Sequence, residues 1–412
     1  MLKPCCGKKL DSQVTNTPVS YSQIQMCSLD GSRDLKVLWE LPKYPLTEAF
    51  GEYQSDFPVF DQALMMCTNC GHVQLQTLID PEFLYSTSNY AFRTESSSKI
   101  NIEIEFLRQF IQNLNIDPQS RNVVEIGASN FELAKHIRLD FHKYAVCDPL
   151  LAAINGTTQD DIYVIGKLAE NAMAEFASFG TSFILGRHVL EHVLNPRVLL
   201  EEIILAADVD CVFAFELPSL SHLRKQYRFD AVFHQHCQYF DLESIELLVT
   251  SLGCELLDFK YNTSGSNGGS ALFAFKKSGK ELVVKTRSRA EIDSKCAQME
   301  KEIAIFESQM TCLSQEILNS YEPVYGYGAA HMLATLNYHL KGAIEKLVAI
   351  LDDNLDLHGT GYKNIDTVIL SPAKVRIEKD AIYLITSMEN RRAILKKLVN
   401  AGPARIFLPA VI

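Results

Sequence analysis

The sequence of 412 residues has no run of about 18 apolar residues, the length that a membrane-spanning helix requires. Its first residues also lack the apolar core of a secretory signal peptide. Positive charge is not in excess, because the formal net charge is −11 and the charged residues are dispersed along the chain. This composition argues against a general nucleic-acid-binding surface. We therefore expect a protein of the cytoplasm with neither membrane nor nucleic-acid partners, present as a monomer or a weak homo-oligomer.

The cysteines do not show the pattern of a secreted disulfide framework. Their number, eleven, is odd, and they are scattered through long apolar segments. Most of them are expected to be small buried side chains in a reducing compartment. No low-complexity tract interrupts the chain, which is long enough for two or three domains, each with its own core.

Three regions differ in pattern. Residues 1–85 are rich in turns, whereas residues 86–278 alternate helices with short apolar strands, which is typical of a parallel α/β sheet. The clearest strands there are "NVVEI", "YAVC", "SFIL" and "CVFAFELP", with "LFAFKK" as a late strand. Residues 279–412 begin with a long segment of helical periodicity and then restart the alternation in a second, smaller α/β unit.

The first region contains a candidate metal site. "CTNCGH" places two residues between Cys67 and Cys70 before a glycine, and "CSLDGS" gives Cys27 and Asp30 the same spacing. Thiolates, and less often carboxylates, are zinc ligands, and a small region with little core gains most from a structural metal. We predict a structural zinc ion bound by Cys27, Asp30, Cys67 and Cys70. Unligated thiols are the alternative, and the competing donors are Cys5, Cys6 and His72.

The central region contains a candidate cofactor site. In "VVEIGASNFELAKHI", Glu125 closes a strand and Gly127 opens the turn, but the GxGxxG pattern that cradles a dinucleotide is absent. Asp148 follows Gly127 by 21 residues and ends the next strand, where an acid can accept both ribose hydroxyls of an adenosine group. These features favour S-adenosylmethionine over NAD, with a ligand-free sheet as the alternative. The predicted cofactor residues are Glu125, Gly127, Ala128, Ser129, Asp148 and, after the next predicted strand, Arg187 and His188.

Several stretches together resemble a known family. "ILGRHVLEHVLNP" resembles the motif that follows a sheet strand in class I methyltransferases. The wider layout resembles the sugar C-methyltransferases that act on nucleotide-linked 4-keto deoxysugars. The stretches that carry this resemblance are "CSLDGSRDLKVLWELPKYPLTEAF", "CTNCGHVQL", "FDAVFHQHCQYF" with "GGSALFAF", "YGYGAAHMLATLNY" and "AILDDNLDLHG". The resemblance implies a zinc-binding domain, a Rossmann-like methyltransferase domain and a smaller Rossmann-like domain at the carboxyl end.

The resemblance also implies a catalytic histidine. His236 stands at the family's catalytic position, and a base that titrates near neutral pH suits removal of a proton beside a ketone. His234 and the amide of Gln235 are candidates for orienting the substrate or stabilising the enolate. If this stretch is extended, His234 and His236 share a face and Gln235 points away. A metal site and a pair of hydrogen-bonded core histidines are the alternatives.

The remaining predicted residues concern the substrate. Tyr90 and Arg93 fall where the family has an active-site tyrosine segment, and Glu216 follows another strand at the ligand edge, where capping of the next turn is its alternative role. In the last region, Tyr327, Gly328 and Asp352 are predicted to bind the nucleotide of the sugar substrate.

Four positions depart from the family pattern. Asp30 replaces a zinc cysteine, Phe131 a glycine, Phe233 a tyrosine and Gln235 a glutamate. We therefore keep three alternatives: an O- or N-methyltransferase, an NAD-linked oxidoreductase that uses "GYGAA", and a binding protein without catalysis.

Overall fold

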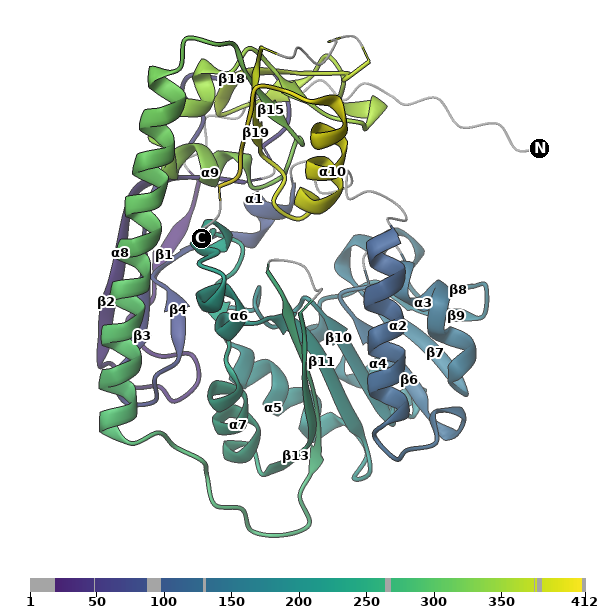
Figure 1. The fold of residues 1–412 in the computed structure, drawn as a ribbon. Coiled ribbons are helices and arrows are strands. Elements are labelled where there is room, and N and C mark those ends of the chain that lie inside the picture. The colour runs from purple at the N-terminus through teal and green to yellow at the C-terminus, as the bar shows by residue number, and fades with distance from the viewer. Residues whose placement is uncertain are drawn as a thin grey trace, which may run out of the picture.

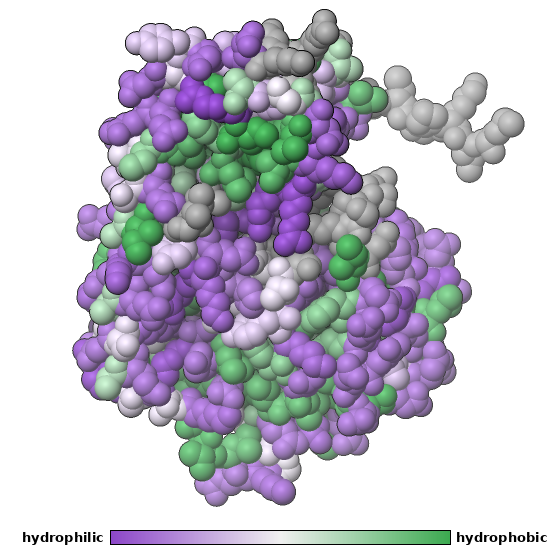
Figure 2. Space-filling view, viewed as in Figure 1, coloured by the Kyte–Doolittle hydropathy of each residue, from purple (hydrophilic) through white to green (hydrophobic). Residues whose placement is uncertain are grey.

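The computed structural model describes residues 19–47, 49–86, 98–128, 131–263, 268–373, 375 and 380–409 (Figure 1). Two α/β sheets and a smaller antiparallel sheet make up most of it. None of the helices in these ranges combines the length and apolar character that crossing a membrane requires. The face shown in Figure 2 is mainly hydrophilic, with a group of hydrophobic residues over the C-terminal unit.

The N-terminal sheet contains a strand from the central region. Its order is β12-β4-β3-β2 and all its pairs are antiparallel. Its strands are β2 (Leu35–Pro45), β3 (Val59–Cys67), β4 (Val73–Leu75) and β12 (Gln238–Tyr239). The short pair β1 (Tyr21–Gln23) and β5 (Thr77–Ile79) and the helix α1 (Pro81–Ser86) complete this part. Because β12 follows the predicted catalytic histidines, this sheet and the central domain meet at that stretch.

The central sheet has eight strands in the order β13-β14-β11-β10-β6-β7-β9-β8. Five of them run parallel: β6 (Asn122–Ile126), β7 (Lys143–Cys147), β9 (Ile162–Ile165), β10 (Phe183–Arg187) and β11 (Val212–Pro218). The antiparallel ones are β8 (Thr158–Gln159), β13 (Cys254–Asn262) and β14 (Ser270–Lys277). The parallel strands are apolar runs because helices cover both faces of the sheet.

Neighbouring residues of one strand show these two faces. Val123 packs in a core with residues of α2 (Ser98–Gln112) and α3 (Glu132–Ile137). Val124 packs in another core with residues of α5 (Pro196–Ala206) and α7 (Leu242–Ser251). The remaining helices of this domain are α4 (Met173–Phe179) and α6 (Leu220–Lys225). The α/β fold class with a Rossmann-like central sheet, predicted from the sequence, is confirmed.

A long helix, α8 (Arg289–Asn319), runs from the central domain to the C-terminal unit (Figure 1). It begins with a capping box, in which Ser288 and Glu291 satisfy each other's backbone N–H groups. The helix α8 lies along the N-terminal sheet. Residues of β2 such as Trp39, of α8 such as Phe306, and of the C-terminal unit share one hydrophobic core.

The C-terminal unit is a second, mainly parallel sheet of order β17-β18-β16-β15-β19-β20. Its strands are β15 (Val324–Tyr327), β16 (Ile350–Leu351), β17 (Gly361–Tyr362), β18 (Ile365–Leu370), β19 (Ile382–Ile385) and β20 (Arg405–Phe407). Two helices accompany them, α9 (Leu333–His339) and α10 (Arg391–Ala401). It is the smaller α/β unit that the sequence predicts.

Candidate functional site

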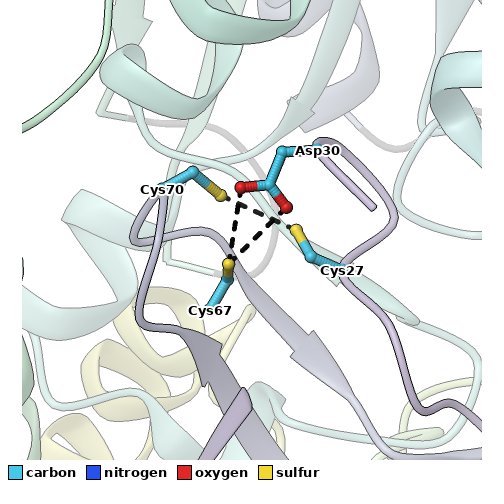
Figure 3. A group of neighbouring side chains, drawn as sticks. All are labelled: Cys27, Asp30, Cys67 and Cys70. Atoms are coloured by element: carbon cyan, nitrogen blue, oxygen red, sulfur yellow. Dashed lines mark hydrogen bonds between the residues drawn. The ribbon is translucent and has the colours of Figure 1, made fainter. Parts of the chain in front are cut away.

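The predicted zinc ligands converge at the foot of the N-terminal sheet. Cys27, Asp30, Cys67 and Cys70 point toward one another (Figure 3), and one donor atom from each lies within 4.8 Å of all the others. The Sγ atoms of Cys27 and Cys70 are 3.6 Å apart, and both carboxylate oxygens of Asp30 are 3.6 Å from Sγ of Cys67. Thiolates that share a tetrahedral zinc ion at 2.3 Å lie about 3.7 Å from each other. The four side chains therefore fit a zinc ion.

Two tight turns produce this convergence. The backbone N–H of Gly31 donates to Cys27 O and that of Gly71 donates to Cys67 O, and both glycines have a positive φ, +72° and +76°. Glycine adopts this left-handed conformation without strain, so each turn brings donors three positions apart to one side. Of the competing donors, His72 lies outside the group and is hydrogen-bonded to Gln238, at 2.9 Å. Cys5 and Cys6 lie outside the described residues.

The predicted cofactor residues gather at the carboxyl edge of the central sheet. Gly127, with φ +75°, turns the chain after β6, and Ala128 beside it is buried. Asp148 follows β7, where its carboxylate accepts the N–H of Leu150 at 2.8 Å. Ser129 lies outside the described residues. The turn after β6 and the acid after β7 thus stand on neighbouring parallel strands, the place where open α/β folds bind adenosine groups.

Phe131, which stands where the family has a glycine, has an unusual backbone conformation. It precedes α3 with φ +65°, the left-handed conformation that glycine adopts freely. For a residue with a side chain this conformation costs about 1–2 kcal/mol. Phe131 therefore holds a backbone conformation that a glycine would adopt without this strain.

Glu125 is a buried carboxyl group at this edge. Its Oε2 accepts the hydroxyl of Tyr144 at 2.7 Å, and burial raises its pKa to about 7. The folded-state pKa lies above the ordinary 4.5, so the contribution of Glu125 to stability is fully present below about pH 4.5. That contribution is lost as the pH rises through about 7.

We expect Glu125→Gln to make the protein more stable than the wild type at pH 8 and nearly equal to it at pH 4.5. The glutamine stays neutral and still accepts from Tyr144, so it avoids an ionisation cost on the order of 3 kcal/mol. Urea unfolding of both proteins at the two pH values measures this difference. The exposed Glu201→Gln serves as the control, and an equal pH dependence in wild type and Glu125→Gln would contradict the assignment.

Arg187 and Glu216 are paired with each other. Nε of Arg187 donates to Oε2 of Glu216 at 2.6 Å, and its NH2 group donates to Glu103 at 3.2 Å. The other oxygen of Glu216 accepts from Ser270 at 2.6 Å, and Glu216 is 1% exposed. Glu216 therefore holds Arg187 in place. Its carboxylate does not cap the following helix α6, whose N-cap is Ser219, and it is not on an open surface.

The stretch with the two histidines is a turn and not a strand. The turn spans His234 and Gln235, and β12 begins only at Gln238. His234 faces the N-terminal sheet: its Nδ1 is 3.0 Å from Nε2 of Gln62 and its Nε2 is 3.2 Å from the carbonyl of Tyr44. Burial lowers the pKa of His234 to about 4, so its ring is neutral at pH 7.

His236 faces the opposite way. Its ring lies 4.0 Å from that of Phe233 and 4.8 Å from that of His192, measured between centroids. The side chain of Gln235 accepts from Thr47 at 2.9 Å, in the N-terminal part. The expected common face of His234 and His236 is therefore wrong, because a turn does not alternate its side chains as a strand does. Of the two histidines, it is His236 whose side chain reaches the edge of the central sheet.

Two residues that lie close to His236 were not predicted from the sequence. Glu191 and His192 lie in the turn after β10, and together with His236 they place three donor atoms within 4.8 Å of one another. The predicted His188 donates from Nδ1 to Oε1 of Glu191 at 3.0 Å and has φ +53°. The signal was present in "RHVLEHV", where a second histidine and an acid follow His188, but their proximity to His236 depends on the fold.

The predicted nucleotide residues lie at the carboxyl ends of β15 and β16. Gly328, with φ +104°, follows Tyr327, and a Cβ atom there would lie 2.3 Å from Cβ of Ser387. Asp352 follows β16 and accepts the N–H of Ala329 at 2.6 Å. These neighbouring parallel strands bring Tyr327, Gly328 and Asp352 together. Tyr90 and Arg93 lie outside the described residues.

Comparison with known proteins agrees with this architecture. Residues 100–258 match the family model described as "Methyltransferase domain", and residues 27–85 match the one described as "Putative zinc binding domain". The C-methyltransferase NovU of Streptomyces niveus is 24% identical over 215 residues, which cover 52% of this chain and 50% of that protein. The chain thus spans about half the length of this curated relative.

Among solved structures, the chain is similar to 1,6-didemethyltoxoflavin-N1-methyltransferase of Burkholderia thailandensis, determined with bound S-adenosylhomocysteine. That similarity has 11% identity and a TM-score of 0.35, and it covers 48% of this chain and 86% of that one. The two family matches follow each other along the sequence in the order that the resemblance predicted. This chain therefore joins a zinc-binding domain to a methyltransferase domain.

Proposed function

We propose that the protein transfers a methyl group from S-adenosylmethionine to a carbon atom of a nucleotide-linked keto-deoxysugar. The observation that carries the proposal is the meeting of two features at one edge of the central sheet. The turn and acid suited to an adenosine group follow β6 and β7, and His236 approaches the end of β10 on the same edge. The match to a methyltransferase domain and the similarity to a C-methyltransferase support this reaction class.

S-adenosylmethionine would supply an electrophilic methyl group. Asp148 would accept the ribose hydroxyls of the cofactor, and Gly127 allows its close approach to the backbone. Glu216 and Glu103 accept hydrogen bonds from Arg187 and so fix its guanidinium group at the end of β10.

His236 is the proposed base. Methylation beside a ketone needs removal of a proton from carbon, and the resulting enolate carbon forms the new bond to the methyl group. His236 would take that proton, because it is the histidine of the stretch that faces the central sheet. His234 and Gln235 support the turn through Gln62, Tyr44 and Thr47 and so would position His236 from the N-terminal side.

The C-terminal unit would bind the nucleotide. The turn at Gly328 and the acid Asp352 stand at the ends of neighbouring strands, the arrangement that binds nucleotides in Rossmann-like folds. In this proposal Tyr90 and Arg93 also contact the substrate, as the family resemblance implies.

A related acceptor is the second candidate. Phe233 and Gln235 have no titratable group, and the Gln235 amide is bonded to Thr47, so two groups of the family's active site are missing. Transfer to a sugar oxygen or nitrogen needs a weaker base than transfer to carbon. Product analysis with a keto sugar and with its hydroxy or amino counterpart separates the two acceptor classes.

Calorimetric titration with S-adenosylmethionine and S-adenosylhomocysteine tests the cofactor. We expect micromolar binding to the zinc-loaded protein, and a roughly 10- to 100-fold weaker affinity for Asp148→Asn, because a charge-assisted hydrogen bond is lost. Asp161→Asn, with a side chain 90% exposed, is the matched control and should bind as the wild type does. No binding to the folded, zinc-loaded wild type would refute the methyltransferase proposal.

A further inference from the structure

Three side chains converge on one point at the edge of the central sheet. Glu191 and His192 come from the turn after β10, and His236 comes from the turn before β12. One donor atom from each lies within 4.8 Å of the others. Glu191 is 1% exposed and His236 4% exposed, whereas His192 is partly exposed, so the point lies at the margin of the interior.

The hydrogen bond of His192 decides which of its nitrogens faces this point. Nδ1 lies 2.8 Å from the carbonyl oxygen of Gln235. A carbonyl only accepts, so Nδ1 carries a proton, and in the neutral tautomer the lone pair of the ring is on Nε2. Nε2 is the nitrogen nearer to the carboxylate, 4.0 Å from Oε1 of Glu191. A histidine that donates its other N–H to a backbone carbonyl is held as metal-binding histidines are.

Glu191 has an oxygen that no described residue satisfies. Its Oε1 is 3.0 Å from Nδ1 of His188, whereas Oε2 is buried and has no hydrogen-bond partner among the described residues. A carboxylate oxygen buried without a partner costs free energy unless a cation or a donor compensates it. The carboxylate of Glu191, with its unsatisfied oxygen, therefore lies beside ring nitrogens of His192 and His236.

We propose that Glu191, His192 and His236 form a binding site for a divalent transition-metal ion, separate from the zinc site of the cysteines. Two histidines and one carboxylate are a ligand set for such ions, and three protein ligands leave coordination positions open. Ligands at 2.0–2.2 Å from a tetrahedral ion lie about 3.4 Å apart, so the 4.0 Å separation of Glu191 and His192 closes by less than about 1 Å. The Nδ1 bond of His192 and the contact of His188 with Glu191 supply the outer hydrogen bonds.

This inference rests on the proposed function, because His236 is both a ligand of the proposed metal site and the proposed base. A nitrogen that binds a metal ion has no lone pair left for a proton. Occupancy of this site and action of His236 as a base therefore exclude each other, so we expect the second metal ion to inhibit methyl transfer.

Zinc content and calorimetry of the protein test the site. The wild type, dialysed against zinc, should hold about two zinc ions per chain, and Glu191→Gln should hold about one. The neutral glutamine has nearly the same shape, so its fold is preserved, and His192→Ala provides a second variant with the same expected loss. Glu201→Gln is the control with an exposed carboxylate and should keep both ions.

Two results would overturn the proposal. They are a wild type with only one zinc ion per chain, and a Glu191→Gln variant that binds the second ion as tightly as the wild type. The same samples are titrated with S-adenosylmethionine, and failure to bind it would refute the proposed function without changing the zinc count.

Discussion

We expect His236→Asn to lower the rate of methyl transfer by about 100- to 10,000-fold while S-adenosylmethionine binds as tightly as before. The reason is that the asparagine approximates part of the ring's volume but cannot accept the proton removed from carbon. Steady-state rates with the best nucleotide-sugar substrate, together with calorimetry of cofactor binding, measure the two effects separately.

The design of this experiment follows from the packing of His236. Its ring lies against Phe233 and His192, so His236→Ala leaves a cavity and His236→Asn is the better-matched variant. The half-exposed His136→Ala is the control and should keep full activity. A His236→Asn protein that retains the wild-type rate would show that the base is another residue.

We also expect removal of the zinc ion to unfold the N-terminal part of the chain. Structural zinc contributes about 10–16 kcal/mol in zinc-finger peptides, as much as the roughly 5–15 kcal/mol that stabilises a typical protein. Cys67→Ser should therefore abolish zinc binding at the cysteine site and lower the melting temperature, measured by metal analysis and circular dichroism. The exposed Cys312→Ser is the control and should keep the metal and the melting temperature.

The effect of zinc removal should extend to the histidine stretch. The N–H of Leu75, in β4, donates to the carbonyl of Cys237 at 2.9 Å, and β4 pairs with β12. The turn with Cys67 and Cys70 precedes β4. If this turn loses its zinc ion, β4 should loosen, and with it the hydrogen bond to Cys237 beside His236. We expect Cys67→Ser to lose methyl transfer as well as metal, and a folded, active, metal-free protein would contradict the zinc assignment.

Local patterns in the sequence were sufficient for the strands and for the metal ligands. Apolar runs such as "NVVEI" and "SFIL" form parallel strands because buried strands need apolar side chains on both faces. Cys27 and Asp30, and likewise Cys67 and Cys70, converge because a glycine turn fixes residues three positions apart. These features depend on neighbours in the chain, so they can be predicted without the fold.

Contacts between distant segments could not be predicted in this way. The two-residue strand β12 is too short to show a period, and it joins the N-terminal sheet only because β4 offers a free edge there. The turn at His234 and Gln235 follows from bonds to Gln62, Tyr44 and Thr47, all more than 170 residues away.

The sequence by itself was enough to predict the order of the zinc-binding and methyltransferase matches, the convergence of Cys27, Asp30, Cys67 and Cys70, and a glycine turn and an acid on neighbouring strands. Each of these rests on a short spacing or an apolar run. Only the tertiary structure decided that His236 faces Glu191 and His192 while His234 faces the N-terminal sheet. It also decided that the carboxylate of Glu216 accepts a hydrogen bond from Arg187. The physical reason is that side-chain direction in a turn, and the pairing of buried charges, depend on segments brought together by the hydrophobic cores and not on adjacent residues.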